Sequence, residues 1–470
     1  MNKNKYRLRF HLMPPSGWMN DPNGLCYYKG FYHVFFQYAP KDPKGKVRYW
    51  GHYISKDLLT WEYVGITIKS DHQWDKSGAY SGCGFTEDGI MELFYTGNVE
   101  EEGNYDYVLE GRGANVITIK SNDGMTFSEK ELLLSNEDYP EDYTCHVRDP
   151  KVWKKDGTYY MLLGGRKKGD KGAILQYQSK DKVHWSLSGE VTTKEPFGYM
   201  WECPDAVTLD GKTILMCCPQ GVPRNELRFQ NIYLSGYFIL EDRDKENIKG
   251  FCNPDDFVPW DYGHDFYAPQ TMRDAKGRTL LIGWAGMPDM DAEYTNQPII
   301  EEGWQHSLTV PRVLTIKNGA VYQNPVEELK LLRDGKIQFV QQGENICYKA
   351  AYETWDMEVE LKKDKNKKEI CFNEEVSLSW ENGIFTVLFT GDCGCGRKKR
   401  QIVVESLENI RILKDVSMFE IYLNQGKYVL TERYFPEETK WILVRIQGAK
   451  DAVMWNLRKM EVHYNISDEE

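Results

Sequence analysis

The sequence predicts an all-β protein in which a five-bladed β-propeller is followed by a C-terminal β-sandwich. Two signals that repeat through the first two thirds of the chain predict the propeller, and short alternating runs separated by turns predict the sandwich. Aromatic residues make up 13% of the chain, a share that suits strands. The chain has 470 residues, which is long for one ordinary core, so we expect two domains.

The first repeated signal is a turn that ends in glycine and is followed at once by an apolar, β-rich run. For example, Asp156-Gly157 precedes the run at residues 158–163. The five glycines are Gly30, Gly89, Gly157, Gly211 and Gly277. They recur about every 60 residues, and each turn predicts a β-hairpin.

The second signal recurs out of phase with the first, at residues 55–61, 121–127 and 179–185. Each copy begins Ser-x-Asp and ends on an aromatic residue, which suggests an outer turn closed by a ring. Repeats of this length with several short strands are typical of four-stranded blades around a channel. An irregular β-sandwich with chance glycine spacing is the alternative, but two separate signals would then have to repeat by chance.

Polar residues precede the five glycines at nearly constant spacing. Eight to ten residues before the glycines stand Asp21, Ser81, Asp149, Glu202 and Tyr267. They share one phase of the repeat, at the start of the strand before each hairpin. If that strand is the innermost of its blade, the five side chains converge at one end of the channel and form a polar pocket.

The last third of the chain predicts a separate domain. Residues 324–333 predict a short helix, with Asn324 as N-cap, Pro325 at the first helical position and Glu327 in a capping-box pattern. The alternating runs beyond it predict an antiparallel sandwich without a catalytic constellation. We therefore expect a propeller over residues 1–318, a linker helix over 319–335 and a sandwich over 336–470.

Composition excludes several kinds of partner. A formal net charge of −12 argues against nucleic acid or an anionic membrane. The N-terminus has no apolar run, so we expect no signal peptide, and no stretch is apolar enough to span a bilayer. The 11 cysteines are scattered without metal-ligand spacing. We expect a cytoplasmic protein with no metal and no cofactor.

Three of the converging residues are acids, and each has an ordinary explanation alone. Asp21 lies in a turn-forming context, Asp149 follows an arginine, and Glu202 lies between Trp201 and Cys203. Together they would place like charges in one cleft, which does not help folding. Glycoside hydrolysis requires such a pair, with one carboxylate as nucleophile and one carboxylic acid as proton donor.

Four segments resemble one family of enzymes. They are residues 11–24 (HLMPPSGWMNDPNG), 148–150 (RDP), 201–205 (WECPD) and 261–270 (DYGHDFYAPQ). In order and spacing they are similar to glycoside hydrolase family 32, which includes invertases, fructanases and bacterial sucrose-6-phosphate hydrolases. The resemblance covers nearly the whole chain, and the first segment is highly specific. It implies a five-bladed propeller followed by a β-sandwich, as the repeats predict independently.

The resemblance also implies roles for individual residues. Asp21 would be the nucleophile, Glu202 the acid/base and Asp149 the stabiliser of the transition state, while Arg148 would orient and balance the acids. Residues that match the family's fructose subsite are Asn20, Gln37, Trp50, Tyr80, Ser81 and Trp284. For the two tryptophans the alternative is structural packing. Cys203 belongs to the motif, and we do not expect it to act as a thiol nucleophile.

The substrate follows less directly. Residues 282–288 and 303–312 are most similar to the sucrose-6-phosphate hydrolase branch, so the resemblance implies release of fructose from sucrose 6-phosphate or sucrose by double displacement. An intracellular exo-acting hydrolase of short fructo-oligosaccharides is an alternative. The expected partner is a small fructosyl saccharide, and the protein would be a monomer or a homodimer.

The chain departs from the family pattern at two places. Many relatives have a tryptophan near the position of Gly45, and a small hydroxyl residue near that of Cys83. An aromatic wall on the leaving-group side is therefore expected to be absent. Lys44, Lys46 and Arg48 suggest contacts with a phosphate on the glucosyl unit, and the alternative is a basic surface loop.

Two further interpretations of the function remain. A fructan-binding propeller without catalysis would lack one of the three acids, and all three are present. A related propeller enzyme acting on arabinose or xylose polymers is the other, and the long context of Asp21 argues against it.

Overall fold

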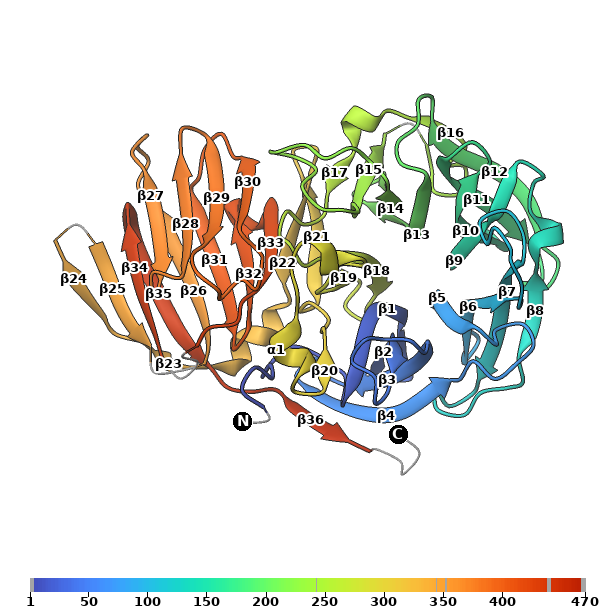
Figure 1. Ribbon diagram of the computed structural model, residues 1–470, viewed down its shortest axis with the longest axis horizontal. Coiled ribbons are helices and arrows are strands. Elements are labelled where there is room, and N and C mark those ends of the chain that lie inside the picture. The colour runs from blue at the N-terminus through green and yellow to red at the C-terminus, as the bar shows by residue number, and fades with distance from the viewer. Residues whose placement is uncertain (1–3, 242, 344, 351–352, 438–440, 466–470) are drawn as a thin grey trace.

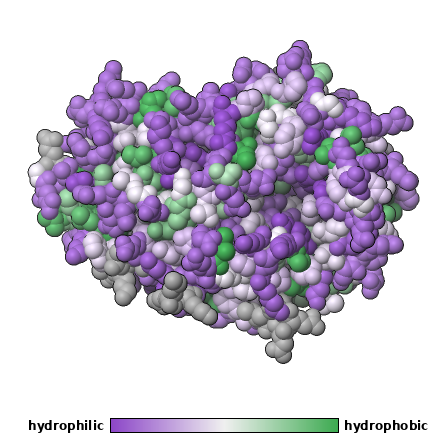
Figure 2. Space-filling model, viewed as in Figure 1, coloured by the Kyte–Doolittle hydropathy of each residue, from purple (hydrophilic) through white to green (hydrophobic). Residues whose placement is uncertain are grey.

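The computed structural model describes residues 4–241, 243–343, 345–350, 353–437 and 441–465. The chain is all-β, as predicted, and forms a ring of sheets with a two-sheet sandwich beside it (Figure 1). Within the described residues no helix is long and apolar enough to cross a membrane. The view in Figure 2 shows a mainly hydrophilic surface with scattered hydrophobic patches.

Five sheets make up the ring. The first contains β1 (Gly17–Tyr28), β2 (Phe31–Ala39), β3 (Tyr49–Ser55) and β4 (Thr60–Ile68). The second contains β5 (Gly78–Glu87), β6 (Ile90–Glu100), β7 (Arg112–Ser121) and β8 (Glu131–Leu134). The third contains β9 (Tyr143–Lys155), β10 (Thr158–Lys167), β11 (Lys171–Ser179), β12 (Ser186–Thr193) and β16 (Gly250–Cys252).

The last two sheets complete the circle. The fourth contains β13 (Met200–Leu209), β14 (Lys212–Gln220), β15 (Gly236–Leu240) and β17 (Val258–Pro259). The fifth contains β18 (Tyr267–Arg273), β19 (Thr279–Trp284), β21 (Arg312–Lys317) and β22 (Ala320–Pro325). The inner strands β1, β5, β9, β13 and β18 surround the centre of the ring, and each contacts the next (Figure 1). Because β18 also contacts β1, the ring is closed.

The glycine turns join inner strands to their neighbours. At four of them the glycine and the residue before it both have positive φ, as a two-residue hairpin of type I′ requires; an example is Asp156-Gly157, at 48° and 72°. The fifth, which ends at Gly277, is instead built on Asp274, whose carboxylate accepts the backbone N–H groups of Lys276 and Arg278.

The Ser-x-Asp signals are the outer turns that were predicted. In the first, the Ser55 hydroxyl accepts the N–H of Leu58, and the Asp57 carboxylate accepts the N–H of Thr60. The indole of Trp61 then donates to the carbonyl of Leu58. The same serine and aspartate bonds recur at residues 121–126 and 179–184. These turns link the third and fourth strands of three sheets.

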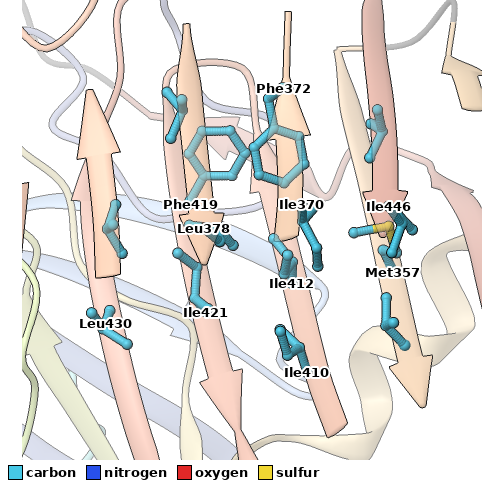
Figure 3. Packing of buried hydrophobic residues seen from close by; sticks show 14 of the residues in the cluster. Met357, Ile370, Phe372, Leu378, Ile410, Ile412, Phe419, Ile421, Leu430 and Ile446 are labelled. Atoms are coloured by element: carbon cyan, nitrogen blue, oxygen red, sulfur yellow. The ribbon is translucent and has the colours of Figure 1, made fainter. Parts of the chain in front are cut away.

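Two sheets stack to form the sandwich. One contains β23 (Arg333–Lys336), β26 (Thr354–Leu361), β31 (Asn409–Asp415), β32 (Met418–Leu423), β33 (Tyr428–Arg433) and β35 (Ala449–Leu457). The other contains β24 (Phe339–Gln342), β25 (Asn345–Ala350), β27 (Lys368–Phe372), β28 (Val376–Glu381), β29 (Ile384–Phe389), β30 (Lys399–Val403) and β34 (Ile442–Gln447). Their facing side chains, among them Met357, Phe372 and Phe419, form the core shown in Figure 3.

The predicted linker helix was too long. Residues Ala320–Pro325 form β22, which stays paired with β21 up to Pro325, and only Glu327–Leu332 forms a 3-10 helix. Val326, not Asn324, is its N-cap residue, and Asn324 instead donates its side-chain amide to the carbonyl of Gln425. Strand pairing therefore overrides a local helix-start pattern.

The remaining elements are short. The other helices described are α1 (Gln297–Ile300) and 3-10 turns at Asn136–Asp138, Pro254–Asp256, Met290–Ala292 and Asn424–Gly426. Two strands join the first sheet in parallel: β20 (Trp304–Gln305) pairs with β1, and β36 (Glu461–Tyr464) pairs with β4. Because β36 follows the sandwich in sequence, the chain returns to the ring near its end (Figure 1).

Buried charges join the two parts. Arg312 in the ring donates to Glu420 of the sandwich at 2.7 Å and to Asp261 at 3.1 Å, and all three side chains are fully buried. His11 also contacts Glu420, at 2.9 Å. Burial raises the pKa of Glu420, but Arg312 and His11 more than reverse this and lower it to about 2.

Removal of Arg312 should destabilise the protein strongly. The Arg312→Ala variant would leave the buried carboxylate of Asp261 without its cation and that of Glu420 with only His11, which costs about 3–5 kcal/mol of the free energy of unfolding. Urea unfolding followed by fluorescence measures this. Lys450→Ala, which removes an exposed ion pair with Glu360, is the control and should leave the transition unchanged. Equal free energies of unfolding for the two variants would contradict the role of Arg312 in joining the ring to the sandwich.

Candidate active site

The inner strands share an irregularity at one level of the ring. In β1, Met19 pairs with Tyr38 and Pro22 with Phe36, so Asn20 and Asp21 together face one residue of β2. This is a β-bulge, which bends the strand and re-aims its side chains. Corresponding breaks in register fall at Tyr80–Ser81, Asp149–Pro150, Cys203–Pro204 and Ala268–Pro269.

Three bulges contain a non-glycine residue with positive φ. The φ angles are 64° at Asp149, 48° at Cys203 and 44° at Ala268, and each residue is followed by proline. Such backbone persists only where neighbours hold it. The N–H of Asp149 donates to the Thr96 hydroxyl at 2.8 Å, and its carboxylate accepts the N–H of Cys203 at 2.8 Å. Two neighbouring bulges therefore hold each other.

A pocket of about 860 Å³ lies at this level. All five polar residues that share the sequence phase line it: Asp21, Ser81, Asp149, Glu202 and Tyr267. Of the other predicted site residues, those that also line it are Asn20, Gln37, Tyr80, Arg148 and Trp284. Residues that come from all five sheets thus meet in one polar cavity.

Trp50 does not line this pocket. It is fully buried, and its indole N–H donates to the carbonyl of Tyr80 at 3.0 Å. The structure therefore places Trp50 behind the pocket wall, where it positions the backbone of β5. Trp284 lines the pocket but is 97% buried and packs edge-on against His306.

A chain of hydrogen bonds from uncharged side chains holds Asp21 in place. The amide of Asn20 donates to Asp21 at 3.0 Å and to Gln37 at 2.6 Å, and Gln37 in turn donates to Ser81 at 2.9 Å. The Ser81 hydroxyl then donates to the second oxygen of Asp21 at 2.5 Å. The Cys203 thiol lies 3.8 Å from that oxygen. Asp21 thus has donors on both oxygens, and no side chain of the described residues forms an ion pair with it.

Glu202 has different partners. Its Oε1 accepts from the Arg148 guanidinium, and its Oε2 accepts from Gln220 and from the Tyr267 hydroxyl, each at 2.7 Å. Gln220 was missed by the sequence analysis, because it lies at the far end of β14 and carries no motif of its own. Two other lining residues that were missed are Trp18 and Arg112.

The acids influence one another's protonation. Burial raises the pKa of Asp149 to about 7; Arg148 opposes the shift, and the charges of Glu202 and Asp21 add to it. Burial also raises the pKa of Asp21, against hydrogen bonds from Ser81 and Asn20. The pKa values of Asp149 and Asp21 are therefore both raised, first by burial and then by the charges of the neighbouring acids.

No metal site is evident in the part of the chain that the structure describes, where no group of three or more His, Cys, Asp and Glu side chains is arranged to hold an ion. The pocket is lined by carboxyl groups and by side chains that donate hydrogen bonds to them.

Comparison with known proteins decides the family. The model for the glycosyl hydrolases family 32 N-terminal domain matches residues 11–325, and the family's C-terminal model matches residues 329–457. The chain belongs to glycosyl hydrolase family 32. The resemblance stated from the motifs is thus confirmed.

Individual relatives of this family cover nearly the whole chain. The chain is 36% identical to a sucrose-6-phosphate hydrolase of Bacillus subtilis over 447 residues, which are 93% of this chain and 90% of the relative. A structure of sucrose-6-phosphate hydrolase from Lactobacillus gasseri superposes with a TM-score of 0.85 at 28% identity, covering 97% of this chain and 94% of the other. A mutant β-fructofuranosidase of Bombyx mori in complex with sucrose gives 0.83 at 29% identity, covering 98% and 95%.

The raised pKa of Asp149 predicts a pH-dependent stability. The folded protein holds this proton up to about pH 7, whereas an unfolded aspartate loses it near its ordinary pKa of about 3.9. Stability from this group is therefore full below pH ~4 and is lost as the pH rises towards 7. Asp149→Asn lacks the titrating group. Its stability relative to that of the unmodified protein should therefore be higher at pH 8 than at pH 4.5.

Thermal unfolding at the two pH values measures the effect. Asp210→Asn, in the exposed hairpin turn between β13 and β14, is the matched control and should show no such trend. If the difference in stability between Asp149→Asn and the unmodified protein is the same at both pH values, a raised pKa of Asp149 is contradicted.

Proposed function

We propose that this family 32 enzyme is a retaining β-fructofuranosidase that releases fructose from the non-reducing end of sucrose 6-phosphate or sucrose. The observation that carries the proposal is the pair Asp21 and Glu202, which share one pocket but have contrasting hydrogen-bond partners. Relatives named sucrose-6-phosphate hydrolase and a relative in complex with sucrose support the substrate.

In the first step Asp21 attacks the anomeric carbon of the fructosyl unit, and Glu202 protonates the departing oxygen. Asn20 and Ser81 direct the oxygens of Asp21, so the nucleophile is oriented before substrate binds. In the second step Glu202 takes a proton from water, which attacks the fructosyl–enzyme ester and regenerates Asp21.

Glu202 must change protonation state twice in each cycle. Arg148 and Tyr267 contact different oxygens of its carboxyl group, which keeps the group in one orientation throughout. Arg148 also balances the negative charge that remains after proton transfer.

Asp149 would accept hydrogen bonds from fructose hydroxyls and strengthen them as the ring becomes oxocarbenium-like. Its own carboxylate is oriented by the N–H of Cys203, within a bulge that depends on Thr96. Gln37, Tyr80 and Trp284 complete the fructose subsite. Trp50 supports this subsite from behind through the carbonyl of Tyr80.

We further propose that the five sheets are the five blades of a propeller, with a domain boundary near residues 319–335 and a sandwich that supports the ring. The buried contact of Arg312 with Glu420 supports such a role. The return of β36 to the first sheet means that the sandwich itself ends before residue 461.

A cytoplasmic location and a monomeric or homodimeric state remain part of the proposal. The 11 cysteines are all free, and most are buried, which suits a reducing compartment. A phosphorylated sugar would be met there. Hydrolysis of short fructo-oligosaccharides is the alternative activity, and a fructan-binding protein without catalysis is the non-enzymatic one.

Loss of either catalytic carboxyl should remove activity without unfolding the protein. Asp21→Ala and Glu202→Ala should each lower kcat by roughly a thousandfold or more, because the nucleophile or the proton donor is lost. Fructose release from sucrose and from sucrose 6-phosphate measures this. With an activated β-fructofuranosyl donor, whose leaving group departs without an acid, azide should partly rescue Glu202→Ala and give β-fructofuranosyl azide, since it attacks the ester without base catalysis.

Asp210→Asn serves as the control and should retain full activity. A folded Asp21→Ala variant with near-normal turnover would refute the assignment. Binding of fructans by the unmodified protein with no fructose release would favour the non-enzymatic alternative.

A further inference from the structure

We propose that Lys44 and Arg48 form a phosphate-binding subsite at the rim of the active-site pocket, which recognises the phosphate of a 6-phosphorylated leaving group. The inference rests on the proposed function and adds the residues that would select the phosphorylated sugar. The contacts of the pocket's cations, the anchoring of the loop that carries two of them, and the charge on the facing rim support it.

Four cationic side chains line the pocket: Lys44, Arg48, Arg112 and Arg148. Two of them already have carboxylate partners, because Arg112 pairs with Glu100 and Arg148 with Glu202. Among the ion pairs of the described residues, none involves Lys44 or Arg48. These two cations therefore have charge available for an anionic ligand.

The loop that carries them is anchored at several points. The Asp42 carboxylate accepts the N–H of Lys44 at 2.9 Å and that of Lys46 at 3.0 Å. Gln305 donates to the carbonyl of Pro43 at 2.7 Å, and the N–H of Ala79 donates to the carbonyl of Arg48 at 2.9 Å. The backbone of the loop is thus fixed before a ligand binds, which lowers the entropic cost of binding.

Gly45 places this loop against the catalytic centre. Its φ is 69°, and a Cβ atom at this position would lie 2.5 Å from the ring of Trp18. The indole of Trp18 donates to Asn20, the residue that orients Asp21. The guanidinium of Arg48 lies 5.8 Å from the centre of the same ring. The ring of Trp18 thus covers Gly45, with Arg48 beside it.

The charge around the rim is uneven. Asp289 and Asp291 line the pocket on the segment after β19 and are exposed, so they repel a phosphate. Lys44 and Arg48 attract it, and Arg can bind two phosphate oxygens at once while Lys supplies a point charge. Lys46 belongs to the same loop but is exposed and does not line the pocket. The three residues carry the same charge, so their position relative to the pocket distinguishes Lys46 from Lys44 and Arg48.

Steady-state kinetics with two sugars tests the subsite. Arg48→Ala and Lys44→Ala should each lower the ratio of kcat/KM for sucrose 6-phosphate to that for sucrose by about tenfold or more, mainly through KM, since each removes a charge-assisted contact. Arg48→Lys should recover part of the loss. Lys46→Ala, the matched control on the same loop, should leave the ratio unchanged.

A fall of both kcat/KM values by the same factor in Arg48→Ala and Lys44→Ala would overturn the subsite, because the loop would then act only structurally. An equal loss of the ratio in Lys46→Ala would also overturn it, since charge alone would then suffice. An unmodified enzyme that hydrolyses sucrose but does not prefer sucrose 6-phosphate would overturn the subsite and leave the proposed function intact.

Calorimetry with glucose 6-phosphate and glucose separates the two proposals, because it needs no turnover. The unmodified protein should bind glucose 6-phosphate at least tenfold more tightly than glucose, and Arg48→Ala should lose that difference. Equal affinities for the two sugars would refute the subsite. Tight, Arg48-dependent binding of glucose 6-phosphate without any fructose release would uphold the subsite and refute the proposed hydrolysis.

Discussion

A repeated bulge in the innermost strands is the constraint on which the pocket depends. At one level of the ring every inner strand has more residues than its neighbour can pair with, so side chains that would alternate between faces turn into the channel. Asp21 and Asp149 lie within their bulges, and Glu202 lies immediately before one. The bulges also support each other, because the N–H of Cys203 binds the carboxylate of Asp149.

This arrangement brings together charges that folding alone would keep apart. Burial and mutual repulsion raise the pKa of Asp149 to about 7, and Arg148 limits the effect. Asp21 receives neutral donors while Glu202 receives a cation, so two carboxyl groups in one pocket have different chemistry. That difference is what a nucleophile and an acid/base require. The buried pairing of Arg312 with Glu420 joins the ring to the sandwich at a distance from this chemistry.

Local signals in the sequence predicted the features that depend on local structure. The glycine turns and the Ser-x-Asp turns each form within a few residues of the chain. Their spacing therefore predicted the sheets and the shared position of Asp21, Asp149 and Glu202 in the repeat. Features that depend on distant contacts were not predictable in this way. The pairing of β22 with β21 replaced part of the expected helix, packing buried Trp50 behind the pocket, and β36 returned to the first sheet. Gln220 reaches Glu202 only through the β13–β14 pairing.

The central claim is that Asp21 forms a covalent bond to fructose. Glu202→Ala, mixed with an activated β-fructofuranosyl fluoride, should accumulate the ester, because the variant lacks the base for its hydrolysis while fluoride leaves without an acid. Digestion at low pH and mass spectrometry of the peptides should then find one fructosyl unit on Asp21. An adduct on the Cys203 thiol, which lies 3.8 Å from Asp21, or fluoride release with inversion and no adduct, would contradict the account.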